Sequence, residues 1–142
     1  MTLRPDAHWH LFVGDETFGP AVGAMLDALP PDRRAVVVLE VDSASVARAL
    51  RADMSRSHGI TFQFLERNGG PVAQASALLD ALDTIDVPPE SRHAYVAGEH
   101  HVVGAIRKAL ATRGLTPDEV SPKAYWRLGR ANADHGEPDG DR

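Results

Sequence analysis

Glycines and acidic residues follow the apolar runs of this chain, and they are the first candidates for chemistry. Gly14, Asp15 and Thr17 come directly after the apolar run of residues 9–13. Gly14 permits a tight backbone turn, and Thr17 is placed to cap a helix whose amino end favours anions. The segment resembles a phosphate-cradling turn, although a capped strand-to-helix turn is the simpler explanation of this segment alone.

The same turn departs from two phosphate-binding motifs. Glu16 stands where the fingerprint Gly-x-Gly-x-x-Gly has its second glycine, and Pro20 follows Gly19 where a P-loop has lysine. Asp15 and Glu16 also place negative charge beside any bound phosphate. The turn by itself therefore does not assign a ligand.

Gly98 and Glu99 open a second strand-to-helix turn, followed by His100 and His101. An acid in a first helical turn is favourable against the helix dipole, which explains Glu99 without any function. Adjacent histidines point about 100° apart on a helix, so we expect no metal site. Asp15 and His100 could meet as acid and base, but the sequence shows no nucleophile–base pair, and catalytic residues stay unassigned.

An aromatic and cationic group lies near the end of the sequence. Tyr125 and Trp126 can stack on a nicotinamide, adenine or flavin ring while Lys123 or Arg127 meets a phosphate. The alternative is a last strand whose aromatic side chains fill the core and whose charges face water.

Strand-like runs alternate with helical stretches along the chain. Strands are expected at residues 9–13, 35–39, 60–65, 93–97 and 123–127. Apolar residues at helical spacing fall between them, at Val22, Met25, Leu26 and Leu29; Val46, Leu50 and Met54; Ala75, Leu78, Leu79 and Leu82; and Val103, Ile106 and Leu110. This pattern predicts an α/β fold, a three-layer αβα sandwich on an open parallel sheet of about five strands.

Local signals add detail to these elements. Ser43 or Ser45 is expected to cap the second helix, Pro71 to open the third and Gly114 to close the fourth. Ligands of open parallel sheets bind outside the carboxyl ends of the strands. Residues 40–42 and 66–67 therefore belong with the turns above among the segments to examine.

Composition excludes several classes of protein. The 142 residues fit one domain, expected at residues 8–130, and contain no cysteine for disulfides or thiol catalysis. No apolar run approaches a membrane span, and residues 1–10 lack a signal core, which favours the cytoplasm. Residues 131–142 contribute −3 of a net charge of −5 and are expected to form a disordered acidic tail. No nucleic-acid partner is expected.

Four segments in register resemble the C-terminal domain of siderophore-interacting proteins, which are ferredoxin-reductase-like flavoenzymes. Residues 13–17 resemble the family's Gly-Asp-Glu-Thr turn, and residues 64–67 its Trp-Leu-x-Arg segment, with Phe64 in place of tryptophan. Residues 95–99 and 106–110 resemble its Val-Ala-Gly-Glu strand and the helix that follows. Residues 125–129 resemble its closing Tyr-Trp-Arg-x-Gly.

The resemblance implies an NAD(P)H-binding module of a ferric-siderophore reductase, which releases iron from siderophores. It implies that the cofactor is bound by Gly14, Asp15, Glu16, Thr17, Gly98, Glu99, Tyr125 and Trp126. Lys123 and Arg127 would face the ferric siderophore or the flavin side. We expect weak binding that Gly14→Val and Gly98→Val reduce, while the choice between NADH and NADPH stays open.

The family's FAD-binding barrel has no counterpart in the few residues before the first strand. FAD is therefore not expected on this chain alone, and the purified chain should be colourless. A separate flavin-binding protein is the expected partner, with a homodimer as a further possibility. The alternative function is a non-catalytic interaction or ligand-sensing protein that kept the fold.

Overall fold

A computed structural model describes residues 1–54 and 58–129. The predicted acidic tail of residues 131–142 lies outside the described residues. The strands are β1 (Trp9–Asp15), β2 (Arg34–Val41), β3 (Ile60–Glu66), β4 (Arg92–Glu99) and β5 (Val120–Trp126). The helices are α1 (Gly19–Ala28), α2 (Ala44–Asp53), α3 (Ser76–Asp83) and α4 (His100–Thr112), with short 3₁₀ turns η1 (Glu16–Phe18) and η2 (Pro117–Glu119).

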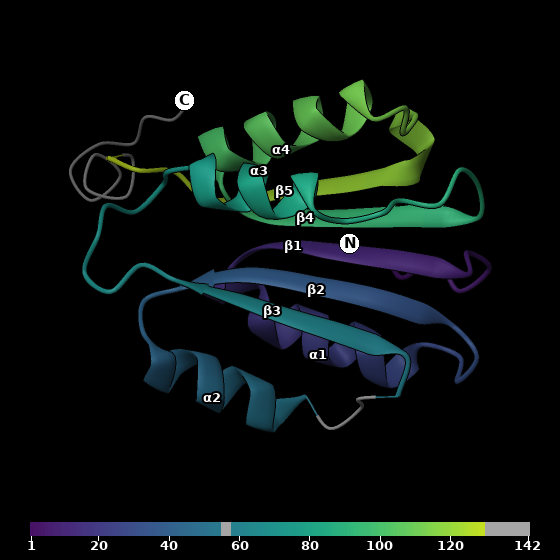
Figure 1. Ribbon diagram of the computed structural model, residues 1–142, viewed down its shortest axis with the longest axis horizontal. Helices are drawn as coiled ribbons and strands as arrows, with labels where there is room; N and C mark the ends of the chain where they lie inside the picture. The colour runs from purple at the N-terminus through teal and green to yellow at the C-terminus, as the bar shows by residue number, and fades with distance from the viewer. Residues whose placement is uncertain (55–57, 130–142) are drawn as a thin grey trace, which may run out of the picture.

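The five strands form one parallel sheet in the order β3-β2-β1-β4-β5, which confirms the predicted fold class. Helices α3 and α4 cover one face of the sheet, and α1 and α2 cover the other (Figure 1). The strand order reverses between β1 and β4, so this pair marks the switch point of the sheet.

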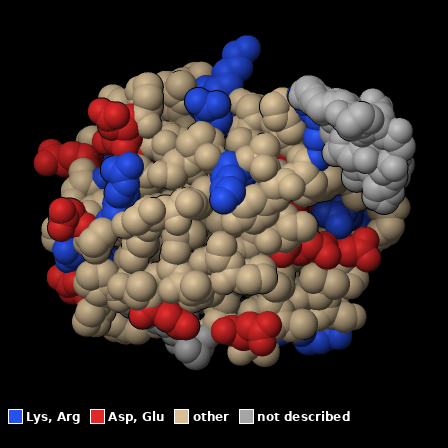
Figure 2. Space-filling view, turned by 180° about the vertical axis from the view of Figure 1, so that it is seen from behind, with Lys and Arg blue, Asp and Glu red and all other residues tan. Residues whose placement is uncertain are grey.

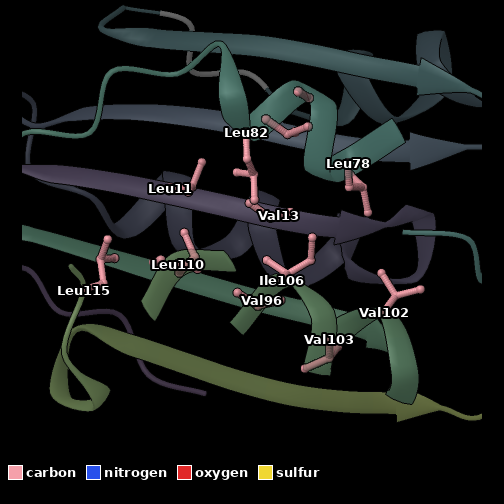
Figure 3. Packing of buried hydrophobic residues seen from close by; sticks show 13 residues of the cluster. Leu11, Val13, Leu78, Leu82, Val96, Val102, Val103, Ile106, Leu110 and Leu115 are labelled. Carbon is pink, nitrogen blue, oxygen red and sulfur yellow. The ribbon is translucent and has the colours of Figure 1, made fainter. Parts of the chain in front are cut away.

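The alternation of side chains along β1 divides the core into two layers. Leu11 and Val13 face α3 and α4, whereas Phe12 between them faces α1. All three are fully buried because both faces of the sheet are covered. Figure 3 shows the first layer, in which side chains from the two helices meet those from β1 and β4: Leu78, Leu82, Ile106 and Leu110 against Leu11, Val13 and Val96.

Helix boundaries follow the expected local signals in two places. The Ser43 hydroxyl accepts a hydrogen bond from the Val46 N–H at 3.4 Å, so Ser43 is the cap of α2. Gly114 adopts a φ of 93° directly after α4, the left-handed conformation that closes a helix.

Two boundary predictions were wrong. Helix α3 begins at Ser76 rather than at Pro71, because residues 72–73 form a bend and residues 71–75 contain no helix after the turn at Asn68 and Gly69. Strand β5 begins at Val120, three residues before the expected start, and includes Pro122. The proline is tolerated because β5 lies at the edge of the sheet, where an N–H facing outward has no strand partner.

A buried polar cluster lies near the amino ends of β1 and β4. The Tyr95 hydroxyl lies 3.0 Å from His10 Nδ1 and accepts a hydrogen bond from the Arg4 N–H at 2.9 Å. His93 Nε2 lies 2.8 Å from the Ser121 hydroxyl oxygen. Both imidazoles are almost fully buried, at 0% and 3% exposure. Burial lowers the pKa of His10 and lowers the pKa of His93 to about 4.

The surface has no extended charged face on the side shown in Figure 2, where basic and acidic side chains are interspersed over a mostly uncharged surface. Within residues 1–54 and 58–129, no helix has the length and apolar character needed to cross a membrane.

Strands β1 and β4 approach each other closely at Gly14. A Cβ atom placed on Gly14 would lie 2.0 Å from the Ala97 carbonyl oxygen and 3.1 Å from the Phe18 ring. The neighbouring atom is backbone in the middle of the sheet, so it cannot move aside without disturbing the β1–β4 ladder. Packing therefore requires glycine at position 14, independent of any ligand.

We predict that Gly14→Ala lowers the free energy of unfolding by about 1–3 kcal/mol, because the added methyl overpacks the β1–β4 contact. Gly104→Ala in α4 is the matched control, since a Cβ there meets nothing within 4 Å. That change should be neutral or stabilise by about 0.5–1 kcal/mol. Urea unfolding of both variants measures the difference, and equal stability of the two would contradict the packing argument.

We also predict that the domain loses stability as the pH falls from about 6.5 to about 4. The unfolded chain binds protons on His10 and His93 near pH 6.5, whereas the folded chain keeps them neutral down to lower pH, so acid favours unfolding. The loss should be on the order of 2 kcal/mol. His93→Gln should flatten this pH dependence, and substitution of the exposed His8 by Gln should not.

Candidate functional site at the carboxyl edge of the sheet

The predicted site residues gather at the carboxyl edge of the sheet. Gly14 lies opposite Ala97 in the β1–β4 register, so the turns after β1 and β4 are neighbours, as predicted. Trp126 lies opposite Glu99 in the β4–β5 register, which brings the aromatic end of β5 to the same edge. Three segments far apart in sequence therefore meet beside the switch point.

Asp15 joins these three segments. Its Oδ1 accepts hydrogen bonds from the Thr17 N–H at 2.9 Å and from the Thr17 hydroxyl. Its Oδ2 accepts a hydrogen bond from the Trp126 indole N–H at 2.8 Å. Asp15 therefore caps η1, the role that the sequence suggested for Thr17, and ties the end of β5 to the end of β1.

The Asp15 carboxylate also lies against Gly98 and limits which residue fits there. It has a φ of 143°, and a Cβ there would lie 2.7 Å from Asp15 Oδ2. The space beside Gly98 is thus filled by Asp15, and the space beside Gly14 by the Ala97 carbonyl. Packing alone explains why both positions are glycine. A valine at either position would therefore disturb the fold, and its effect on ligand binding could not be separated from that disturbance.

Glu99 is a buried carboxylate at the start of α4, only 1% exposed. One oxygen accepts hydrogen bonds from the N–H groups of His101 and Val102 at 2.9 and 3.0 Å. The other accepts one from the Leu128 N–H at 3.1 Å and lies 3.1 Å from His101 Nδ1. Burial alone would raise the pKa of Glu99, but these donors outweigh it and hold the pKa below its ordinary value.

At the amino ends of η1 and α4, the anions that accept the backbone amides are therefore carboxylates of the protein itself. Glu99 occupies the amino end of α4, and Asp15 occupies the first free amide of η1. A phosphate at either position would compete with a carboxylate that is already hydrogen-bonded. Helix α1, by contrast, begins after Phe18, which makes no side-chain capping hydrogen bond.

Basic and aromatic side chains lie along β5. Tyr125 is 36% exposed and packs edge-on against Phe18, with ring centroids 6.1 Å apart. Lys123 Nζ lies 5.9 Å from the centroid of the Tyr125 ring. Arg127 has a buried Nε with no hydrogen-bond partner. The alternative in which these aromatic side chains fill the core is wrong for Tyr125, which is 36% exposed.

A surface cavity of about 400 Å³ adjoins this group, between the first half of α4 and β5. Lys123 and Arg107 are among its lining residues, and His100 and His101 lie at its α4 side. The residues that line it are His100, His101, Val103, Gly104, Arg107, Pro122, Lys123 and Ala124, which include no carboxylate. The cavity suits an anionic group better than a cation.

The other half of the edge carries a cluster that the sequence did not reveal. Arg67, after β3, lies 3.1 Å from Glu16, 3.5 Å from Glu40 and 3.9 Å from Asp42. The four residues are called the Arg67 cluster below. The segments at the ends of β2 and β3 were marked for examination, but nothing in their spacing shows that one arginine joins three carboxylates.

No group of three or more residues able to hold a metal ion is found in the described ranges 1–54 and 58–129. The rings of His100 and His101 are almost perpendicular, at 85°, with centroids 5.2 Å apart. Both histidines line the cavity, and His101 also lies within hydrogen-bond distance of Glu99.

Known proteins resemble this chain over nearly all of the described residues. Ferric vibriobactin reductase ViuB of Vibrio cholerae is 32% identical over 131 residues, which cover 90% of this chain and 46% of that protein. An uncharacterized protein of Mycobacterium tuberculosis is 29% identical over 138 residues, covering 89% and 47%. The chain thus spans about half the length of these relatives.

Solved structures give the same result. A siderophore utilization protein from T. fusca superposes with a TM-score of 0.72 at 27% identity, covering 89% of this chain and 47% of that one. The siderophore-interacting protein SipS from Aeromonas hydrophila gives 0.68 at 23% identity, covering 89% and 53%. The FAD/NAD-binding domain of a Vibrio cholerae nitric oxide dioxygenase gives 0.63 at 13% identity, covering 89% and 54%, which shows a shared ferredoxin-reductase-like fold alone.

The model of one protein family, described as siderophore-interacting protein, matches residues 7–129, which include every strand and helix of the sheet. The resemblance of the four sequence segments is thereby confirmed, and the chain belongs to the siderophore-interacting protein family.

Proposed function

We propose that this chain is the NAD(P)H-binding domain of a ferric-siderophore reductase and works with a flavin held by another domain. The observation that carries the proposal is the hydrogen bond from the Trp126 indole to Asp15. It brings the aromatic and cationic end of β5 onto the switch point, where dinucleotides bind in open parallel sheets. Membership of the siderophore-interacting protein family supports the same proposed function.

The described residues fit some parts of a nicotinamide dinucleotide better than others. Tyr125, which is 36% exposed, offers an aromatic ring for stacking with a flat ligand ring. Lys123 and the adjoining cavity offer positive charge for the phosphates. Asp15 already accepts the Thr17 amide and Glu99 the amides of His101 and Val102, so these three amides add little to phosphate binding. Weak binding is the consequence.

When bound, the nicotinamide supplies a hydride, which a flavin accepts and passes on as single electrons to Fe(III). The iron of a ferric siderophore is the substrate in this scheme, and its reduction weakens the hard oxygen-ligand complex. The role of this chain is to hold the nicotinamide at the carboxyl edge, with Lys123 and Arg127 turned toward the flavin or siderophore side.

A second function, a non-catalytic interaction or ligand-sensing protein, has one observation in its favour. The two helix amino ends beside the switch point are closed by the protein's own carboxylates. A domain that had lost nucleotide binding would have no use for open anion sites there. Nucleotide titration separates the two functions directly.

We predict that the chain binds NADH or NADPH with a dissociation constant between about 0.1 and 1 mM, measured by calorimetry at low ionic strength. Lys123→Ala should weaken binding about tenfold, because an exposed cation beside the stacking surface is lost. Lys108→Ala is the control, since Lys108 is also exposed but does not line the 400 Å³ cavity. No heat of binding at millimolar nucleotide would favour the interaction protein.

We also predict that the purified chain is colourless and that added FAD does not stay with it through gel filtration. Tyr125 lies at the surface of the carboxyl edge, 36% exposed, whereas tight cofactor sites bury most of their ligand. Absorbance near 450 nm, compared with the protein absorbance, measures this. A stoichiometric yellow chromophore would overturn the need for a separate flavin domain.

A further inference from the structure

The Arg67 cluster lies where the adenosine end of a dinucleotide would reach the sheet. Asp15 lies opposite Glu40 in the parallel β1–β2 register, so the ends of β1 and β2 are neighbours on the side away from β4. The aromatic group of β5 lies on the other side, beyond β4. A dinucleotide with its nicotinamide near Tyr125 and its centre at the switch point therefore extends over the end of β2, where acidic residues commonly bind the adenosine ribose.

Hydrogen bonds fix the cluster in place. Glu16 Oε1 accepts the Asp42 N–H at 2.8 Å and a hydrogen bond from Arg67 at 3.1 Å. The Asp42 side chain is 61% exposed, whereas the Arg67 side chain is only 12% exposed. The carboxylate of Asp42 is thus presented to solvent while the cation lies behind it.

Three carboxylates lie around one guanidinium here, whose buried Nε has no hydrogen-bond partner. If Arg67 turned toward a new phosphate, Glu40, whose side chain is only 9% exposed, would remain buried without its cation. Removing one partner of a buried ion pair is costly, because the other charge loses its compensation. Arg67 is therefore poorly available to a ligand.

We infer that the domain binds NADH in preference to NADPH, with Asp42 facing the adenosine ribose. A free ribose diol offers hydroxyl donors that a carboxylate accepts well. A 2′-phosphate offers only acceptors and carries up to two negative charges, which Asp42 and Glu16 repel. This inference rests on the proposed function and adds to it the identity of the nucleotide.

Calorimetric titration with NADH and with NADPH tests the inference. We expect NADH to bind at least about tenfold more tightly at low ionic strength, since one unfavourable charge contact of this kind corresponds to a factor of ten. The preference should shrink as salt is raised from about 50 to 300 mM. Adenosine 5′-monophosphate and adenosine 2′,5′-bisphosphate, used as fragments, should show the same order.

Substitutions at position 42 locate the effect. Asp42→Asn should reduce the preference to a few-fold, and Asp42→Lys should bring NADPH to equal or tighter binding than NADH. Both changes leave the Asp42 backbone N–H in place for Glu16. Asp32→Asn is the matched control, because Asp32 is 71% exposed but lies before the opposite end of β2.

The outcomes separate the two proposals. Equal or tighter binding of NADPH by the unaltered chain, or a ratio unchanged in Asp42→Lys, would overturn the inference and leave the nucleotide-binding function standing. Binding of neither nucleotide at millimolar concentration would remove the function itself, and the inference with it.

Discussion

The buried carboxylate of Glu99 is the constraint on which the carboxyl edge depends. A carboxylate that is 1% exposed must be satisfied by donors, and the backbone at the start of α4 and after β5 supplies them. The same hydrogen bonds fix where the segment after β5 lies relative to the switch point. Asp15 repeats the arrangement one strand away through Trp126. The aromatic end of β5 is thus held by two carboxylates from two neighbouring strands.

The carboxyl edge of the sheet carries different charges on the two sides of Asp15 and Glu99. On the side of β4 and β5, Lys123 and Arg107 line a cavity without acidic residues. On the side of β1, β2 and β3, the single cation Arg67 is shared among three carboxylates. A ligand that spans the edge would therefore meet positive charge at one end and hydrogen-bond acceptors at the other.

The sheet could be predicted well from the sequence because apolar residues recur at regular intervals along the strands and helices. Continuous apolar runs such as residues 35–39 indicate strands covered on both faces, and the stripe of Val103, Ile106 and Leu110 indicates a helix. The prediction that α3 begins at Pro71 was wrong because a proline suits a loop as well as the first turn of a helix. The site was predicted only as a set of segments. That Asp15 caps η1 is a local feature, because the capped amide of Thr17 lies two residues away. The hydrogen bond from Trp126 to Asp15 joins residues 111 positions apart, which no local pattern contains.

The composition of the two edge strands also determines how copies of this domain can meet. A strand that adds to a sheet needs a continuous row of N–H and C=O partners, and Pro122 interrupts that row in the middle of β5. Strand β3, at the other edge, contains no proline and carries the stacked pair Phe62 and Phe64, with Arg51 lying 4.1 Å from the centroid of the Phe62 ring. If copies of this domain associated through backbone pairing, β3 would therefore be the more suitable edge, away from the strand that carries the aromatic residues of the candidate site.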